Sequence, residues 1–430
     1  MARIVLVGAG SITFAKNLLS DILTFPELSE STIVLHDIDQ ARLDTAEAMA
    51  RWMVTELGIG ARIEAYADRR AAVEGADYVI NEIAVGGLEA VRRDLEIPAA
   101  YGVRQTIGDT LGIGGIFRAL RTIPVMVGIG DDLAELAPGS VLFTYTNPMS
   151  MIPWSVYAGT PFKNVVGVCH AARDTQRTLA AMVGVPEEEI SFLTAGVNHQ
   201  AFVLRFEHNG ENLYRRLDEL IDQDPELRRR VRVEVYRNFG YFPTESSEHG
   251  SEYLPWFLPH AEEVERYRIP INVYLEWLAD GYEEYEQYKG SLAAGHGVPI
   301  ERGEELASLA IHSMETGTRR MIHGNVRNGG LITNLPPEAT VEVPCHVDRS
   351  GVQPVLVGEL PAQVAALNRA FLSVGELTVK AALEGRRDHV YQAALLDPNT
   401  AATLPVRKVR ELVDALIEAH GELLPEGIRK

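Results

Sequence analysis

Cysteine is scarce in this chain of 430 residues, which contains only Cys169 and Cys345. Two cysteines cannot build a disulfide framework, and such scarcity is typical of proteins kept in a reducing compartment. Met1 leads directly into the apolar run Arg3 to Val7 and a glycine turn, a pattern typical of a first strand and not of a secretory signal peptide. No apolar stretch approaches the roughly 20 residues that a membrane span needs. We therefore expect a cytoplasmic protein without a membrane segment.

Basic charge is also in short supply. Lys and Arg number 40 against 60 Asp and Glu, which gives a formal net charge of -20. Such a surface repels phosphate backbones and anionic lipids, so neither nucleic acid nor a membrane is an expected partner. A small anionic substrate stays compatible, because one arginine pocket is enough to bind it. The chain also lacks internal repeats and low-complexity segments, and its length predicts two packed domains.

Short apolar runs alternate with helical patterns through the first part of the chain. The runs predict buried strands at residues 3–7, 32–35, 77–83, 141–145 and 165–168. Alternation of this kind, with a helix expected over 11–24, predicts a doubly wound parallel α/β sheet of the Rossmann type. Later the pattern loosens into inserted strands and into helices at 175–182, 361–384 and 406–420. We expect a nucleotide-binding Rossmann domain over 1–168 and an α+β metal- and substrate-binding domain over 169–430.

A glycine turn follows the first strand. Gly8 and Gly10 let the backbone approach a pyrophosphate, and the helix that follows attracts its negative charge. Thr13 replaces the usual third glycine of this fingerprint. Asp37, at the end of the second strand, can bind a ribose 2′-hydroxyl and would repel a 2′-phosphate, which favours NAD over NADP. The expected NAD-binding residues are Gly8, Gly10, Ser11, Asp37 and, in a later strand, Asn81.

A cysteine-histidine pair, Cys169-His170, follows the strand at 165–168. This is the carboxyl end of the strand, where open α/β sheets bind their ligands. Asn198-His199 follows another apolar run and supplies a second nitrogen donor. A thiolate and an imidazole predict a metal site with open positions for substrate oxygens. The same dipeptide recurs at Cys345-His346, where the preceding apolar residues indicate a strand, and there we expect a structural role.

An ordered series of motifs extends over nearly the whole chain. It comprises Val7 to Ser11, Asp109 to Gly112, Tyr145 to Met149, Gly167 to His170 and Asn198-His199, and most specifically Gly240 to Trp256 and Gly324 to Leu335. With these motifs the sequence resembles glycoside hydrolase family 4, the NAD- and metal-dependent glycosidases, and most closely its bacterial α-galactosidases. This family is an exception to glycoside hydrolysis by two carboxylates.

The resemblance implies hydrolysis by elimination in place of direct displacement. In that scheme NAD oxidises C3 of the sugar, a base removes the acidified C2 proton, and a divalent metal, Mn²⁺, stabilises the enediolate. The aglycone leaves with help from an acid, water adds to the double bond, and NAD is regenerated. The resemblance also implies a homodimer or homotetramer.

Site roles come from the same resemblance, position by position. Cys169 and His199 match the metal ligands, and His170 matches the proton donor to the leaving group, for which a histidine is suited near neutral pH. The C2 base is expected between Thr244 and Tyr253, as His249 or Tyr253, with Glu248 a third candidate. The remaining matches are Asp109, which tunes the base, Asn147, which contacts substrate and cofactor, and Arg92 or Arg93, which contacts the sugar.

The residues after Cys169 bear on the substrate. Relatives that act on phosphorylated sugars carry Asp or Asn at the position of His170, so the histidine favours an unphosphorylated glycoside. Arg173 either meets a carboxylate at C6 or, as we favour, is a solvated residue at a helix start. We expect an α-galactosidase, with α-glucosidase and α-galacturonidase or α-glucuronidase as alternatives. A 2-hydroxy-acid dehydrogenase with the lactate and malate dehydrogenase architecture, or a sugar-binding protein without catalysis, is more distant.

Overall fold

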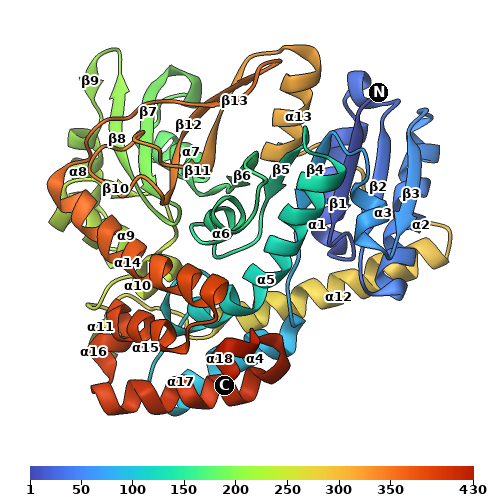
Figure 1. Cartoon of the computed structure of the whole chain (residues 1–430). Coiled ribbons are helices and arrows are strands. Elements are labelled where there is room, and N and C mark those ends of the chain that lie inside the picture. Colours follow the sequence, from blue (N-terminus) through green and yellow to red (C-terminus); the bar gives the residue numbers. More distant parts are fainter.

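The computed structural model describes residues 1–430, apart from the side chain of Ile12. Its first half contains six parallel strands, which are β1 (Arg3–Val7), β2 (Thr32–His36), β3 (Arg62–Tyr66), β4 (Tyr78–Asn81), β5 (Val141–Thr144) and β6 (Val165–Val168). They lie in the order β3-β2-β1-β4-β5-β6, which is the strand order of a Rossmann fold (Figure 1). The expected α/β fold with a parallel sheet is confirmed.

Helices connect these strands because amphipathic segments follow each apolar run. They are α1 (Ile12–Leu23), α2 (Gln40–Leu57), α3 (Arg69–Val73), α4 (Gly87–Ala100), α5 (Gly112–Leu136) and α6 (Ile152–Gly159). On α1 the side chains of Leu18, Leu19 and Ile22 are fully buried, at the helical spacing that the sequence predicts.

The helix α5 is long and apolar enough to cross a membrane by length and composition alone, contrary to the expectation that no such segment exists. However, 78% of its most apolar window is buried inside the protein. The buried residues include Arg118 and Arg121, two charged side chains that are paired within the fold. In this structure α5 is therefore a central core helix.

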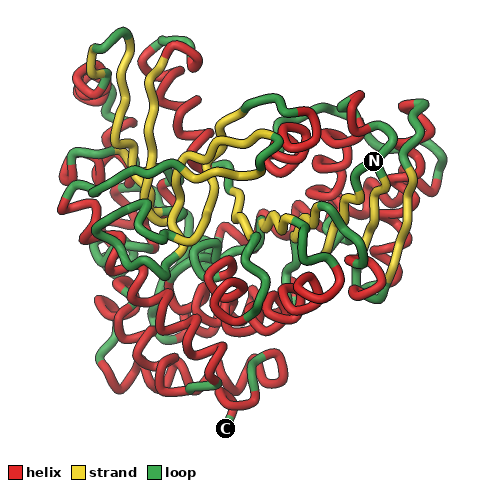
Figure 2. The backbone as a smooth tube through the Cα atoms, turned by 45° about the horizontal axis from the view of Figure 1, so that its top comes forward, coloured by secondary structure: helices red, strands yellow, loops and turns green.

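The second half adds seven strands to the same sheet. They are β7 (Ile190–Val197), β8 (Gln200–His208), β9 (Glu211–Asn212), β10 (Phe242–Pro243), β11 (Arg320–Arg327), β12 (Thr340–Asp348) and β13 (Gly351–Pro354). The strand β11 pairs antiparallel with β6 and continues the sheet as β6-β11-β12-β7-β8-β10 (Figure 2). The boundary expected at residues 168 and 169 thus falls at the end of β6, the last parallel strand, inside one continuous sheet.

Twelve helices belong to the second half. They are α7 (Ala171–Val183), α8 (Tyr214–Gln223), α9 (Val231–Phe239), α10 (Ser247–Glu252), α11 (Ala261–Arg266), α12 (Val273–Ala293), α13 (Leu306–Thr316), α14 (Ala362–Glu384), α15 (Arg387–Leu396), α16 (Pro398–Thr403), α17 (Val406–His420) and α18 (Glu426–Arg429). The helix α12 contacts α1, α2 and α4, and in Figure 1 it passes below the parallel strands. The helices α14 to α18 gather at the lower left of the same view. The two halves of the chain are therefore interlocked.

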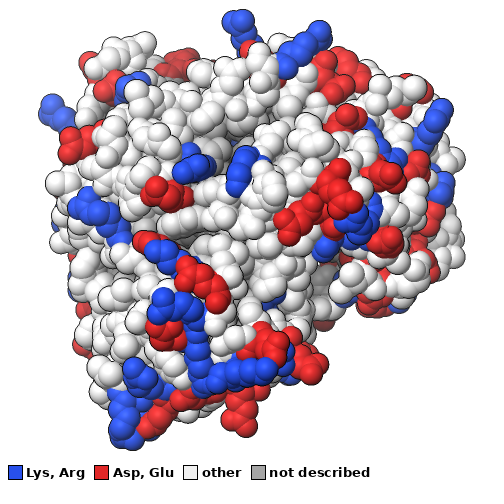
Figure 3. Space-filling view, in the orientation of Figure 1, with Lys and Arg blue, Asp and Glu red and all other residues white. Residues whose placement is uncertain are grey.

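One large apolar core contains residues from both halves, and it runs from Ala2 to Ile428 in sequence. Cys345 lies in this core on β12 and is fully buried, as its expected structural role requires. A smaller core packs the β7–β8 hairpin against α7, α8 and α9. On the outside, basic side chains mostly lie among acidic ones over the face in Figure 3.

Candidate active site and metal centre

Three side chains that can bind a metal meet beside the junction of the parallel and antiparallel parts of the sheet. Cys169 follows β6, His199 lies in the turn between β7 and β8, and Glu245 comes shortly after β10. Their donor atoms all lie within 4.8 Å of one another. The Cys169 sulfur is 3.4 Å from His199 Nε2, which is 3.2 Å from a carboxylate oxygen of Glu245. The fold thus brings the two expected ligands together and places Glu245 beside them as a third candidate.

His199 is oriented by its other ring nitrogen. Nδ1 lies 3.1 Å from the Thr110 hydroxyl and 3.1 Å from the Tyr253 hydroxyl, so Nε2 faces Cys169 and Glu245. Metal-binding histidines are commonly fixed in this way by partners behind them. The backbone of His199 adopts a φ of 66°, the left-handed region that costs energy for residues other than glycine. The tight turn between β7 and β8 therefore holds this histidine in one defined position.

The donor set fits a divalent transition metal. Thiolate, imidazole and carboxylate are all ligands for such ions, and three protein donors leave positions for substrate or water oxygens. Burial, together with the carboxylates of Glu245 and Glu342, raises the pKa of the Cys169 thiol, so a nearby cation is needed to stabilise its thiolate. Burial lowers the pKa of His199 and favours the neutral imidazole that binds metals.

Glu245 was not predicted as a metal ligand from the sequence, although it lies in the segment in which a base was expected. Its placement depends on β10, whose Phe242 and Pro243 pair with Val203 and Phe202 of β8. This pairing brings residue 245 beside the β7–β8 turn, and no local pattern reveals it. A useful signal was available in the residue type alone, because a carboxylate completes a cysteine-histidine metal site well.

The two preferred candidates for the base border the metal cluster, the group formed by Cys169, His199 and Glu245. His249 lies on α10, Tyr253 follows that helix, and Tyr253 Oη is 2.8 Å from His249 Nδ1. The rings of His249 and His199 are 4.5 Å apart between centroids. Burial opposes a charge on His249, but nearby carboxylates, led by that of Glu252, outweigh it and raise its pKa to about 9. Burial and the same acidic surroundings raise the pKa of Tyr253, and a cation at the cluster would lower both values.

Asp109 connects the base region with Asn147. Its carboxylate accepts hydrogen bonds from Asn147 Nδ2 at 2.9 Å and from the Thr110 hydroxyl at 2.7 Å. Burial opposes ionisation of Asp109, but Arg118 and the two histidines outweigh it and lower its pKa to about 2. Arg118 also donates to the backbone oxygen of Asn147 at 3.1 Å. Asp109 therefore carries a stable negative charge next to the metal cluster.

Arg92 and Arg93, which we expected to contact the sugar, do not reach this cluster. Arg92 is half exposed on α4 and lies 3.8 Å from Glu96. Arg93 donates to the backbone oxygen of Ala419 on α17 at 2.8 Å. This face of α4 meets α17 and solvent, which is the physical reason for the difference. The buried cation beside Asp109 is Arg118, which the apolar pattern of α5 concealed.

The glycine turn lies between the ends of β1, β2 and β4. A Cβ on Gly8, whose φ is 95°, would lie 3.0 Å from the backbone nitrogen of Ile83. A Cβ on Gly10 would lie 2.5 Å from an oxygen of Asp37, and this oxygen accepts a hydrogen bond from the Gly10 N–H at 2.8 Å. Ser11, the N-cap of α1, makes no capping bond with its side chain, which leaves the first N–H groups of the helix available. These residues fit a dinucleotide.

Asn81 has a different environment from the rest of the expected NAD residues. Its side-chain amide donates to the hydroxyls of Thr144 and Thr146, each at 3.0 Å, and so ties β4 to β5. Its carbonyl oxygen is buried and has no hydrogen-bond partner among the described side chains. The structure therefore gives Asn81 a role in the sheet and leaves one acceptor available.

His170 lies at the start of α7, next to Cys169. Its ring packs on that of Tyr145 with centroids 6.0 Å apart, and its Nε2 is 3.1 Å from a carboxylate oxygen of Glu305. Arg173, one turn later, forms an ion pair with Glu304. The side chain of Arg173 is only 19% exposed, so our preference for a solvated residue is wrong.

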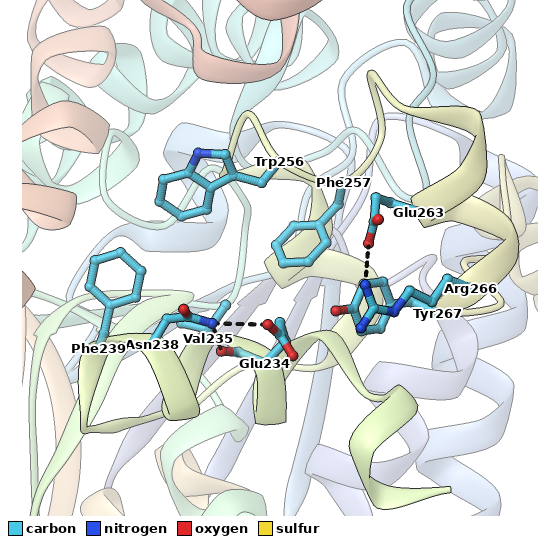
Figure 4. A pocket seen from close by; sticks show the side chains of 9 residues that line it. All are labelled: Glu234, Val235, Asn238, Phe239, Trp256, Phe257, Glu263, Arg266 and Tyr267. Atoms are coloured by element: carbon cyan, nitrogen blue, oxygen red, sulfur yellow. Dashed lines mark hydrogen bonds and ion pairs between the residues drawn. The ribbon is translucent and has the colours of Figure 1, made fainter. Parts of the chain in front are cut away.

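A hollow of about 450 Å³ lies elsewhere on the surface, beside α9 and α11. In it Phe239 stacks on Trp256 with ring centroids 5.7 Å apart, and Arg266 pairs with Glu263 (Figure 4). None of the residues lining this hollow belongs to the metal cluster or to the glycine turn. It is a separate feature of the molecule.

Curated sequences resemble this chain over nearly its whole length. An α-galactosidase from Bacillus subtilis is 39% identical over 99% of this chain and 100% of the relative. An α-galactosidase from Rhizobium meliloti is 34% identical over 99% of this chain and 89% of the relative. An α-glucosidase from Erwinia rhapontici is 30% identical over 96% of this chain and 97% of the relative.

Solved structures share the fold. The Bacillus subtilis protein lplD has a TM-score of 0.87 at 27% identity, covering 96% of this chain and 98% of its own. A 6-phospho-α-glucosidase from gut microorganisms, solved in complex with NAD and Mn²⁺, has a TM-score of 0.83 at 20% identity, covering 99% of both chains. Lactate dehydrogenase from Eimeria maxima is more distant, with a TM-score of 0.55 at 15% identity over 89% of this chain and 95% of its own.

Two family models match consecutive parts of the sequence. The model of the family 4 glycosyl hydrolases matches residues 3–185, and the model of their C-terminal domain matches residues 194–400. All three side chains of the metal cluster lie within these ranges, and so does the whole sheet apart from the first four residues of β7. The chain therefore belongs to the family 4 glycosyl hydrolases.

Proposed function

We propose that this family 4 enzyme hydrolyses unphosphorylated α-galactosides, with NAD and Mn²⁺ as its cofactors. The observation that carries the proposal is the cluster of Cys169, His199 and Glu245, whose donor atoms lie within 4.8 Å of one another. The identity of 39% to an α-galactosidase supports this sugar, and the NAD and Mn²⁺ of the related 6-phospho-α-glucosidase support the cofactors.

The two proposed cofactors would supply different parts of the reaction. When bound, NAD supplies a reversible oxidation of the sugar, and the metal supplies a positive charge for the sugar's oxygens. The proposed metal ligands are Cys169, His199 and Glu245. The proposed NAD-binding residues are Gly8, Gly10, Ser11, Asp37, Asn81 and Asn147.

His249 and Tyr253 are the proposed pair that removes the C2 proton. Their side chains are 2.8 Å apart, so a proton taken by one can pass to the other. The ionised Asp109 stabilises the imidazolium that His249 forms when it takes a proton, and so raises the basicity of this pair. On the other side of Cys169, His170 is the proposed donor of a proton to the leaving group.

Arg173 supports a neutral sugar over a uronide. Its guanidinium pairs with the carboxylate of Glu304 and donates to the Glu304 backbone oxygen at 2.7 Å. A cation that is already neutralised is a poor partner for a carboxylate at C6. An α-glucoside differs from an α-galactoside only in the configuration of one hydroxyl. A panel of substrates therefore separates the α-glucosidase alternative from the α-galactosidase.

The proposal is tested by hydrolysis of p-nitrophenyl α-galactoside, which should require NAD, Mn²⁺ and a reducing agent that protects Cys169. Cys169→Ala should lower activity and Mn²⁺ affinity by at least about 100-fold, because a ligand is lost. Cys345→Ala removes the cysteine of the second Cys-His dipeptide, which lies in the core, and should leave both within about 2-fold of wild type.

Full activity after exhaustive chelation, or wild-type activity of Cys169→Ala, would refute the metal-dependent mechanism. A panel of α- and β-linked nitrophenyl galactosides, glucosides and uronides, with NAD and Mn²⁺ present, tests the substrate separately. Turnover of the α-galactoside should exceed that of the α-glucoside and of both uronides. Net formation of NADH without glycoside cleavage would favour a dehydrogenase instead.

A further inference from the structure

Glu305 lies against His170 from an irregular segment that connects α12 to α13. One oxygen of its carboxylate is 3.1 Å from His170 Nε2, and the Glu305 side chain is only 12% exposed. This oxygen is shielded from solvent and, although it lies close to Nε2, it accepts no well-aligned hydrogen bond in the structure. A buried carboxylate oxygen without a donor is costly, and the groups close enough to donate to the Glu305 carboxylate are His170 Nε2 and the Tyr145 hydroxyl.

The backbone of Glu305 is fixed on both sides. Asp21 of α1 accepts hydrogen bonds from the N–H groups of Gly303 at 2.5 Å and of Glu305 at 2.6 Å. Two residues later, the N–H of Ala307 donates to the Tyr145 hydroxyl at 3.1 Å. The segment is therefore held to α1 and to the end of β5 by contacts that do not involve His170.

A second anchor comes from α7, the helix that begins directly after His170. Arg173 donates to the backbone oxygen of Glu304 at 2.7 Å, and both Arg173 and Arg177 form ion pairs with the Glu304 carboxylate. The residue before Glu305 is thus clamped to the first two turns of the helix that begins after His170. The short distance between these two side chains is set by the fold around them.

The ring of His170 has one nitrogen left for another group. Its face packs on Tyr145 with an interplanar angle of 29°, and Nε2 faces the Glu305 carboxylate at 3.1 Å. Nδ1 makes no hydrogen bond to a described side chain, and 35% of the His170 side chain is exposed. A carboxylate behind a histidine fixes its tautomer and its direction, as in other catalytic pairs.

We propose that Glu305 is the positioning residue for His170: it accepts a hydrogen bond from Nε2–H and thereby directs Nδ1 at the glycosidic oxygen. This inference rests on the proposed function, in which His170 protonates the leaving group. In that step His170, protonated on both ring nitrogens, loses its Nδ1 proton, which forms a bond to the glycosidic oxygen. The C1–O bond breaks with its electron pair left on that oxygen, while the electron pair released at C2 forms the C1–C2 double bond.

The test compares two leaving groups in Glu305→Gln. Nitrophenolate departs without an acid, whereas an alcohol such as that of methyl α-galactoside needs one. We expect kcat/KM to fall about 10- to 100-fold for the methyl glycoside and less than about 3-fold for the nitrophenyl glycoside. A merely structural role would lower both alike, and equal losses would overturn the proposal. Glu301→Gln, an exposed change in the same segment, should alter neither.

A double variant tests whether Glu305 acts through His170. Added to His170→Ala, the Glu305→Gln change should cost less than about 2-fold on either glycoside, because its target is already absent. A full additional loss would overturn the proposal. Inactivity of the wild type on both galactosides would refute the proposed function instead. The ¹⁵N signals of His170 in histidine-labelled protein show which ring nitrogen carries the proton of the neutral ring. This should be Nε2 in wild type, and the preference should be lost in Glu305→Gln.

Discussion

Buried carboxylates behave in two opposite ways in this protein. Asp109 is surrounded by Arg118 and two histidines, which outweigh the cost of burial and lower its pKa to about 2. Asp397, the N-cap of α16, has no such cation, and burial raises its pKa to about 6. Both are aspartates in mixed polar and apolar sequence, so residue type alone does not separate them. Their neighbours in space decide the sign.

Asp397 should make the protein less stable as the pH rises. Its ordinary pKa is 3.8 and its folded pKa is about 6, so between these values the folded state binds more protons than the unfolded state. Stability therefore falls through this window, and the loss persists at neutral pH. Asp397→Asn keeps the capping bond from the Thr400 N–H and should add about 1–3 kcal/mol to the free energy of unfolding at pH 7.5, and little at pH 4.

Urea unfolding at the two pH values measures this difference. Asp39→Asn is a matched control, because Asp39 caps α2 in the same way but is exposed to solvent. It should change stability by less than about 0.5 kcal/mol at either pH. An equal effect of Asp397→Asn at pH 4 and pH 7.5 would contradict a raised pKa for Asp397.

Individual elements follow from local patterns much better than their pairings do. The expected helix at 406–420 and strand at 165–168 agree with α17 and β6. The pairings of β6 with β11 and of β8 with β10 join segments far apart in sequence, and apolar periodicity carries no information about them. The sequence could therefore propose Cys169 and His199 as metal ligands one by one, whereas the position of Glu245 beside them could not be predicted.

The start of α5 shows how an element supports the site. A Cβ on Gly115 would lie 2.6 Å from the backbone carbon of Thr110, the residue whose hydroxyl faces His199 Nδ1. Gly115→Ala should therefore displace the segment behind His199, the proposed metal ligand. We expect at least about 10-fold weaker Mn²⁺ binding and a loss of about 1–3 kcal/mol in the free energy of unfolding.

Gly128→Ala in the same helix provides the comparison. There the new Cβ would lie 3.1 Å from the end of the Arg69 side chain, which can shift. This variant should bind Mn²⁺ as wild type does and change stability by less than about 1 kcal/mol. Calorimetric titration with Mn²⁺ and urea unfolding measure the two quantities. Normal Mn²⁺ affinity in Gly115→Ala would show that the segment can relax.

Contacts between the Rossmann half and the C-terminal helices hold the molecule together. Asp94 of α4 lies 2.6 Å from the guanidinium of Arg121 on α5 and 2.9 Å from Nε2 of His420 on α17, and all three side chains are buried. The C-terminal helices are thereby fastened to the Rossmann half. A large core that extends from Ala2 to Ile428 has the same effect.

Removing Asp94 should therefore destabilise the whole chain. Asp94→Asn leaves the Arg121 charge buried without its partner, and we expect a loss of about 3–5 kcal/mol in the free energy of unfolding by urea. Glu411→Gln breaks the exposed pair with Arg407 and should cost less than about 1 kcal/mol. Similar losses in the two variants would mean that the buried pair gives no special support.

The strand order also has a consequence for the time at which the protein becomes a metalloenzyme. Cys169, His199 and Glu245 are all synthesised early, but β11 and β12, from residues 320–348, lie between the strands that present Cys169 and His199. A growing chain that has exposed its three donors still lacks the two strands that set their spacing. We therefore expect the proposed site to bind its ion only after β11 and β12 have been synthesised and paired.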